Sequence, residues 1–180
     1  MFWKKHKGKL IAAALVLLAL AALAALAAAL FRGGERPGAD SGYSCTISIS
    51  CASILDHLEL CDPEKIELVP ENGWILEPVS VIFYEGESVF DVLQRTCRQQ
   101  KIHMEYSDTP LYHSAYIEGI ANLYEFDAGE RSGWMYRVNG WFPNYGCSRY
   151  QLQDGDVVEW VYTCELGNDV GGGYAAEGNE

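Results

Sequence analysis

The sequence predicts an α+β fold in which one main helix packs on a mixed β-sheet. Two observations predict it. Residues 43–51 alternate between apolar and polar side chains, which is the pattern of a strand with one buried face. Residues 85–100 place apolar side chains three and four positions apart, which is the pattern of an amphipathic helix. Several strand-like stretches follow this helix, and such an order of elements is typical of α+β domains.

A hydrophobic segment precedes the folded body. Residues 1–9 are basic and contain no acidic side chain; their lysines are Lys4, Lys5, Lys7 and Lys9. Within residues 10–31, every side chain from Leu10 to Leu30 is Ala, Leu, Ile or Val, enough for a helix that spans a bilayer of about 30 Å. We expect a signal-anchor, a single transmembrane helix that leaves the body outside the cytoplasm. The alternative is a cleaved signal peptide and a secreted, extracellular protein.

The first half of the body contains a hairpin and the main helix. Residues 32–42 are rich in glycine and form a flexible linker. We expect a strand over Tyr43–Cys51, a short helix near Ile54–Leu60 and a second strand over Pro78–Tyr84. In the helix at Glu85–Gln100, the side chains of Ser88 and Asp91 have the spacing of a capping box.

The second half is predicted to be β-structure. We expect strands at residues 102–106, 116–118 and 134–138, and a closing strand over Val157–Cys164. Between the last two, Asn139-Gly140 predicts a type I′ turn, because both turn positions require positive φ. Residues 167–180 are expected to be a disordered tail. This order fits a β-grasp-like domain over residues 43–166, with the last strand parallel to the first.

The charge of the body argues against a nucleic-acid partner. Beyond the four N-terminal lysines, nine basic residues face 25 acidic ones, a net charge of about −16. A nucleic acid or an anionic lipid surface would be repelled by this charge.

Six cysteines follow the export segment, and an even number in that context predicts disulfides. If the last strand lies beside the first, Cys45 pairs with Cys147 at one end of the sheet and Cys51 with Cys164 at the other. The third pair, Cys61 with Cys97, follows only by elimination.

Aromatic side chains gather around the predicted turn. Trp134 and Tyr136 share one side of a strand, so we expect them in the core, and a ligand-facing role is the alternative. Trp141, Phe142 and Tyr145 follow the turn in a loop, where aromatic side chains are harder to bury and more often touch a partner. With the amides of Asn139 and Asn144, they are the predicted ligand-binding residues.

The stretch from Ser132 to Thr163 resembles the transcobalamin-like C-terminal domain family, and so does YEGESVFDVL at Tyr84–Leu93. The matching residues are Gly133-Trp134, Asn139-Gly140, Gly146, Tyr150, Gly155-Asp156 and Trp160. The resemblance implies a β-grasp-like ligand-binding module, with cobalamin or a related corrinoid as the ligand. In the animal cobalamin carriers, the similar domain closes over one face of the corrinoid while a helical toroid, which this sequence does not contain, holds the other.

We therefore expect a membrane-anchored, extracytoplasmic module that binds a small molecule, alone or with a partner protein. The alternative is a cell-envelope protein-interaction or adhesion module without a small-molecule ligand, in which the same rings contact a protein or a glycan. The sequence contains no phosphate loop, nucleotide fingerprint, HExxH motif or GxSxG elbow, so we expect no enzyme. We also expect no metal site, because His103 and His113 stand alone in the sequence.

Overall fold

The computed structural model describes residues 42–109 and 114–172. The described residues belong to one compact unit, which begins at Gly42. The predicted basic region, the apolar segment and nearly all of the linker lie outside the described residues. Within the described residues, no helix is long and apolar enough to cross a membrane.

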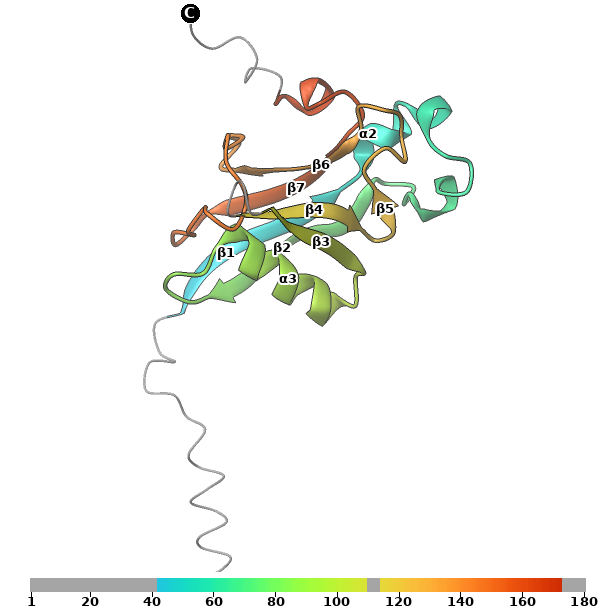
Figure 1. The fold of residues 1–180 in the computed structure, drawn as a ribbon. Coiled ribbons are helices and arrows are strands. Elements are labelled where there is room, and N and C mark those ends of the chain that lie inside the picture. Colours follow the sequence, from blue (N-terminus) through green and yellow to red (C-terminus); the bar gives the residue numbers. More distant parts are fainter. Residues whose placement is uncertain (1–41, 110–113, 173–180) are drawn as a thin grey trace, which may run out of the picture. The chain divides into compact units, whose positions relative to one another are not determined.

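Four strands make the main sheet: β1 (Tyr43–Ser50), β2 (Trp74–Phe83), β6 (Gly133–Val138) and β7 (Val157–Thr163). Their order is β2-β1-β7-β6 (Figure 1). Strand β7 runs parallel to β1, with Ile47 opposite Val158 and Ile49 opposite Trp160, whereas the other two pairs are antiparallel. The prediction that the closing strand lies parallel to the first is confirmed.

The main helix, α3, covers one face of this sheet and spans Val89–Gln100. Its start is fixed by the predicted capping box: the Ser88 hydroxyl accepts a hydrogen bond from the Asp91 backbone, and the Asp91 carboxylate accepts one from the Ser88 backbone. Lys101 ends the helix in the left-handed conformation, with φ of 58°. The buried side chains of α3 pack on the apolar residues of β1, which confirms a mixed α+β fold with one main helix.

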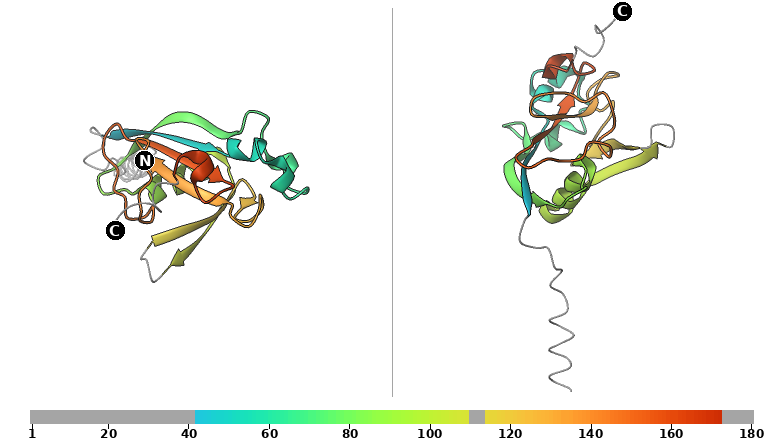
Figure 2. Two further views of the ribbon diagram at one scale, coloured as in Figure 1. Left: turned by 90° about the horizontal axis from the view of Figure 1, so that it is seen from above. Right: turned by 90° about the vertical axis from the view of Figure 1, so that its left-hand side faces the viewer.

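A smaller antiparallel sheet completes the core. It contains β3 (Met104–Thr109), β4 (Ser114–Ile120) and the two-residue strand β5 (Leu123–Tyr124), in that order. Figure 2 shows the ribbon of β3 and β4 set at an angle to the four-stranded sheet. The sequence pattern did not indicate β5, because two residues are too few to display a period.

The predicted short helix and the start of the second strand differ in the structure. The expected helix at Ile54–Leu60 is instead a single turn, α2 (Ala52–Leu55), followed by the 3₁₀ turns η1 (Leu58–Leu60) and η2 (Ile66–Leu68). Strand β2 begins at Trp74, four residues before the predicted start at Pro78. It lies at the edge of the sheet, where a proline without a backbone N–H is tolerated.

The predicted tail is also ordered at its beginning. Residues Asn168–Val170 form the 3₁₀ turn η3. The Asp169 carboxylate accepts hydrogen bonds from the Thr163 hydroxyl and from the Cys164 backbone, which fastens η3 to the end of β7. Residues 173–180 lie outside the described residues.

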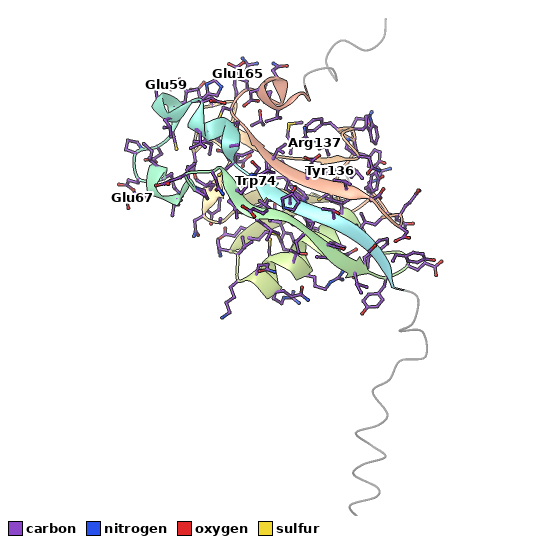
Figure 3. All side chains as sticks on the ribbon, turned by 180° about the vertical axis from the view of Figure 1, so that it is seen from behind. Glu59, Glu67, Trp74, Tyr136, Arg137 and Glu165 are labelled. Carbon is purple, nitrogen blue, oxygen red and sulfur yellow. The ribbon has the colours of Figure 1, made fainter. Side chains whose placement is uncertain are left out.

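The face of the main sheet turned away from α3 carries more polar side chains. Figure 3 shows this face from behind, with Trp74 and Arg137 on it. The guanidinium of Arg137 donates two hydrogen bonds of 2.7 Å to the carboxylate of Glu159 on the neighbouring strand. This bidentate pair ties β6 to β7 across the solvent side of the sheet.

All six cysteines are buried thiols, and no disulfide joins any two of the described residues. They divide between two apolar clusters: Cys45, Cys97 and Cys147 lie in the main core, and Cys51, Cys61 and Cys164 lie in a smaller core at the end of β1 and β7. In each of the predicted pairs Cys45–Cys147 and Cys51–Cys164, both cysteines therefore lie in the same cluster. Cys61 and Cys97 lie in different clusters, so the structure does not favour the pair that rested on elimination.

Candidate functional site

The aromatic residues around the predicted turn fall into three environments. Trp134 and Tyr136 belong to the core, as expected: the Trp134 ring packs edge-on against Tyr162, and the Tyr136 ring lies against Trp160. The indole of Trp134 donates a hydrogen bond of 2.8 Å to the Leu123 carbonyl. The Tyr136 hydroxyl donates to the Tyr145 carbonyl at 2.8 Å, so the polar atoms of both side chains have partners within the fold.

Asn139 holds the turn together. Asn139 and Gly140 have φ of 52° and 79°, the two positive values that the predicted type I′ turn requires. The Asn139 amide donates to the Asp156 carboxylate at 2.8 Å and accepts from the Val157 backbone at 2.9 Å. The side chain is therefore occupied in joining two loops. The turn closes only one bridge, between Val138 and Trp141, rather than a full hairpin.

Phe142 packs against the ordered C-terminal segment. The Arg137 guanidinium lies 5.8 Å from the centre of the Phe142 ring, and a side-chain carbon at Gly172 would meet the ring at 3.3 Å. The ring thus covers the edge of β6 beside η3. Phe142 is a predicted ligand-binding residue, but its ring contacts Arg137 and does not line the hollow described below.

The loop residues that follow Phe142 line a hollow of about 370 Å³. One wall is the loop from Pro143 to Gly146, which includes the predicted residues Asn144 and Tyr145. The other wall is the start of β4, residues 114–116, and Arg149 completes the lining. The two walls touch where Gly146 meets Ser114, since a side-chain carbon at Gly146 would stand only 2.0 Å from the Ser114 hydroxyl oxygen.

A row of aromatic rings runs along the loop wall of this hollow. Tyr145 stacks on Tyr150 with ring centres 6.4 Å apart and an angle of 15° between the planes. On its other side, Trp141 meets Tyr145 edge-on at 6.2 Å, and 53% of Trp141 is exposed. Large rings that are held in place but open to solvent provide flat contact area at a low cost in conformational entropy.

Arg149 supplies a positive charge to the hollow. Its guanidinium lies 5.9 Å from the centre of the Tyr145 ring, and Arg149 forms no salt bridge with the described residues. Its backbone N–H donates to the Gly146 carbonyl at 3.0 Å, which fixes the residue beside the loop wall. In a protein of net charge −12, a guanidinium without a carboxylate partner favours an anionic group.

Tyr116 faces the hollow from β4. Its hydroxyl donates to the Glu125 carboxylate, which fixes the orientation of the ring. Burial, together with the hydrogen bond and negative charge of Glu125, raises the pKa of Tyr116 to about 12. The phenol therefore stays protonated at physiological pH, and its ring offers an uncharged face to the hollow.

The sequence did not indicate the second wall. Residues 114–116 have no motif of their own, and they reach the hollow only through the path of β4. Arg149 could have been predicted as a site residue, because it is a basic side chain that closely follows the aromatic loop in an otherwise acidic body. Tyr150 was marked only by the family resemblance.

The cysteines do not add a nucleophile to the hollow. Burial raises the pKa of all six thiols: to about 12 for Cys51 and Cys97, to about 11 for Cys45, Cys147 and Cys164, and upward for Cys61. Thiols with raised pKa are poor nucleophiles and poor metal ligands at neutral pH.

Metal ligands are also dispersed. Among residues 42–109 and 114–172, no three His, Cys, Asp or Glu side chains come together as a metal site. His103 is engaged with the Glu105 carboxylate at 2.9 Å and the Tyr124 hydroxyl at 3.2 Å. His113 lies outside the described residues.

Comparisons with known proteins support the resemblance to a cobalamin-carrier domain only in part. A family model described as "Domain of unknown function (DUF4430)" matches residues 86–164, which is less than half of the chain. No curated protein matches the sequence.

The solved structures that are similar to the chain include two from different proteins. Haptocorrin in complex with Cbi is 16% identical with a TM-score of 0.49, and the match covers 73% of this chain but only 27% of the haptocorrin chain. A candidate metal-binding protein from Ruminococcus gnavus ATCC 29149 is 12% identical with a TM-score of 0.40, and the match covers 67% of this chain and 96% of that one. Neither likeness is close enough to carry an argument about a ligand, and the DUF4430 model is the family to which the second half of this body is similar.

Proposed function

We propose that the protein is a small-molecule-binding module and that its site is the hollow between residues 143–146 and the start of β4. The observation that carries the proposal is the combination in one hollow of two tyrosine faces, Tyr116 and Tyr145, with the free guanidinium of Arg149. A hollow of about 370 Å³ lies within the range of small-ligand sites, roughly 300–1,000 Å³.

The chemistry of the hollow points to a flat, conjugated ligand with an anionic edge. The face of such a ligand would stack on Tyr145, and its charged edge would reach Arg149. Asn144 is exposed at the rim and can exchange hydrogen bonds with polar substituents. Trp141 lies beside Tyr145 and would extend the stacking surface for a ligand larger than the hollow.

A corrinoid is the first large ligand to test, because the resemblance in the sequence implied one. A corrinoid exceeds the hollow, so only one of its faces or edges would rest on this surface. We therefore infer that a partner protein would have to cover the rest of a bound corrinoid. A smaller aromatic anion could bind without such a partner.

We further propose that the body is a β-grasp-like domain held outside the cytoplasm by the apolar segment at residues 10–31. The strand order β2-β1-β7-β6, with α3 between the first hairpin and the later strands, supports the β-grasp assignment. The four lysines before the apolar segment support the orientation. Binding rather than catalysis is supported by the raised pKa values of the thiols, which are poor nucleophiles.

The experiment that tests the binding site is isothermal titration calorimetry with three probes: cobalamin, cobinamide and 8-anilinonaphthalene-1-sulfonate, a flat aromatic anion. The variants Arg149→Gln and Tyr145→Ala should each weaken binding of the aromatic anion by about tenfold or more, since each removes a main contact. Arg131→Gln is the matched control, because Arg131 is equally exposed and does not line the hollow.

Three results would decide against the proposal. Absence of binding of all three probes at high micromolar concentration would remove the free-standing small-molecule site. Equal losses in the Arg149 and Arg131 variants would mean that only the general charge matters. Binding that survives Tyr145→Ala would place the ligand elsewhere on the protein. The orientation is tested separately, with an alkaline phosphatase fused after residue 42, which should be active only if the body is exported.

A further inference from the structure

A second hollow, of about 490 Å³, lies at the other end of the body. One side is formed by residues 60–63, which follow η1, and the other by residues 126–130 in the loop between β5 and β6. In Figure 1 the segment between α2 and β2, which contains η1 and η2, lies at the end where β7 finishes, far from the loop that joins β6 to β7. The predicted aromatic residues make no part of this hollow, so it needs its own explanation.

Exposed apolar side chains make the walls of the second hollow. Leu60 and Phe126, which face it from the two sides, are 46% and 61% exposed. Nearby in the sequence, Leu58, Ile66 and Leu68 are also more than a third exposed. Apolar side chains that gather in this way around a hollow are typical of contact surfaces rather than of ordinary solvent-facing segments.

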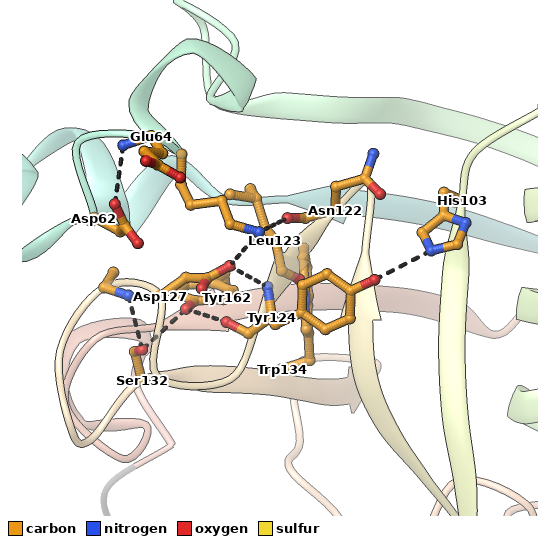
Figure 4. Close-up of polar contacts among 12 residues, drawn as sticks. Asp62, Glu64, His103, Asn122, Leu123, Tyr124, Asp127, Ser132, Trp134 and Tyr162 are labelled. Atoms are coloured by element: carbon orange, nitrogen blue, oxygen red, sulfur yellow. Dashed lines mark hydrogen bonds and ion pairs between the residues drawn. The ribbon is translucent and has the colours of Figure 1, made fainter.

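The loop that presents Phe126 is held in one conformation by hydrogen bonds, which Figure 4 shows. The Ser132 hydroxyl accepts from the Ala128 backbone at 3.1 Å and shares a hydrogen bond of 2.9 Å with the hydroxyl of Tyr162. The Asp127 carboxylate accepts from the Tyr124 backbone at 2.8 Å. A partner would thus meet a preformed surface and would not have to order this loop on binding.

The charge around the second hollow is strongly negative. Residues 56–71 contain a single lysine and six acidic side chains: Asp56, Glu59, Asp62, Glu64, Glu67 and Glu71. The lysine, Lys65, is already engaged: its ammonium lies 3.2 Å from the Asp127 carboxylate and 4.9 Å from the centre of the Tyr124 ring. At the hollow itself, Asp62 and Glu130 are exposed, and neither forms a salt bridge with the described residues.

We propose that this second hollow docks a basic, apolar segment of a partner protein. An apolar side chain of the partner would pack between Leu60 and Phe126, and flanking lysine or arginine side chains would meet Asp62 and Glu130. The negative charge excludes an anionic lipid surface as the occupant. With its exposed apolar walls at Leu60 and Phe126, the hollow of about 490 Å³ is larger than a small cation would fill, which suits a side chain of a polypeptide.

Fluorescence anisotropy with labelled peptides tests the proposal on the full chain and on residues 42–180. The probe is a 14-residue peptide of leucine and lysine with helical periodicity. Its controls are a leucine–glutamate peptide of the same pattern and a serine–lysine peptide of the same charge. Only the leucine–lysine peptide should bind well, because the proposal requires both apolar contact and opposite charge.

The variants locate the site. Phe126→Asn removes the ring but keeps a residue that tolerates the left-handed backbone of this position, where φ is 71°, so the loop should stay folded. We expect binding to weaken by about tenfold or more. The double variant Asp62→Asn/Glu130→Gln should weaken binding by about fivefold at low salt and reduce its salt dependence. The matched controls are Leu166→Asn and Glu77→Gln/Glu85→Gln, which change exposed residues elsewhere.

Each outcome supports or overturns the proposal. A loss of binding confined to the Phe126 and Asp62/Glu130 variants supports it, provided that circular dichroism shows these variants to be folded. Tight binding of the leucine–glutamate peptide would show that charge plays no part. Equal binding of the serine–lysine peptide would show that the apolar walls play none. If tetramethylammonium displaced the peptide at equal affinity, the site would be one for small cations, and if no peptide bound, docking of a basic segment would be wrong.

Discussion

Replacement of Gly146 by alanine should separate the two walls of the proposed ligand site. A side-chain carbon at Gly146 would stand 2.0 Å from the Ser114 hydroxyl oxygen and 2.3 Å from the Ser114 side-chain carbon. Atoms that are not bonded do not approach so closely, so the loop and the start of β4 must move apart. The obstacle is a short side chain close to the backbone, which cannot swing away as a long flexible one could.

The expected cost follows from measured effects of overpacking. Forcing extra carbon atoms into a packed site destabilises proteins by about 1–3 kcal/mol. For a body of this size, each kcal/mol lowers the melting temperature by about 4 °C. Gly146→Ala should therefore lower the melting temperature by roughly 4–12 °C and should also weaken ligand binding, because the hollow changes shape. Thermal unfolding followed by circular dichroism measures the first effect and calorimetric titration the second.

Two further variants separate a steric effect from a general one. Gly133→Ala is the matched control, because its added carbon would meet only the side-chain carbon of Glu125, at an ordinary 3.6 Å. Ser114→Gly removes the obstacle, although it also removes an acceptor for the Ser148 backbone N–H. The Gly146→Ala/Ser114→Gly double variant should lose less stability than the sum of the single losses. A Gly146→Ala protein that melts like the wild type, or a double variant with additive losses, would refute the reasoning.

Three other predictions test the fold and its sulfur chemistry. Ser88→Ala removes the capping hydroxyl of α3 and should cost about 1 kcal/mol in urea unfolding; an unchanged midpoint would mean that the cap contributes nothing. Arg137→Lys replaces the bidentate contact with Glu159 by a single one and should cost about 0.5–1 kcal/mol, a loss that should disappear in a Glu159→Gln background. Burial raises the pKa of Cys45 to about 11 and that of Cys51 to about 12, from the ordinary 9.0, so their contribution to stability is complete below about pH 9 and is lost as the pH rises toward the folded values. Urea unfolding in reductant from pH 8 to 10.5 should thus show stability falling as the pH rises, and a stability that does not change over this range would refute the prediction.

Local sequence patterns were sufficient to predict the elements that obey local rules. The alternation over residues 43–51 predicted β1 within one residue, because the strand period is visible in a single segment. The spacing of Ser88 and Asp91 predicted the start of α3, and Asn139-Gly140 predicted a turn with two positive φ values. The parallel pairing of β1 and β7 was also predicted, since a hairpin, a helix and a buried closing strand leave few arrangements that bury one face of the sheet.

Elements without a local signal were missed. Strand β5 is too short to show a period, and the start of β2 was hidden by Pro78, which is acceptable only because β2 lies at an edge. A short helix was predicted near Ile54–Leu60, whereas the structure forms the single turn α2 and the 3₁₀ turn η1 there. The ordered turn at Asn168–Val170 depends on Asp169 meeting Thr163 and Cys164, a contact that composition does not reveal.

The sequence alone identified the aromatic loop, but only the tertiary structure decided which of its rings stand together. Trp141 and Tyr145 remain beside the hollow, whereas Phe142 turns toward Arg137 and Gly172. The opposite wall comes from β4, about thirty residues away, and its position depends on how the smaller sheet packs on the main core. Alternation, caps and turns are set by neighbours along the chain and can be read from them, whereas a binding surface is set by contacts between distant segments, whose geometry exists only after the core has formed.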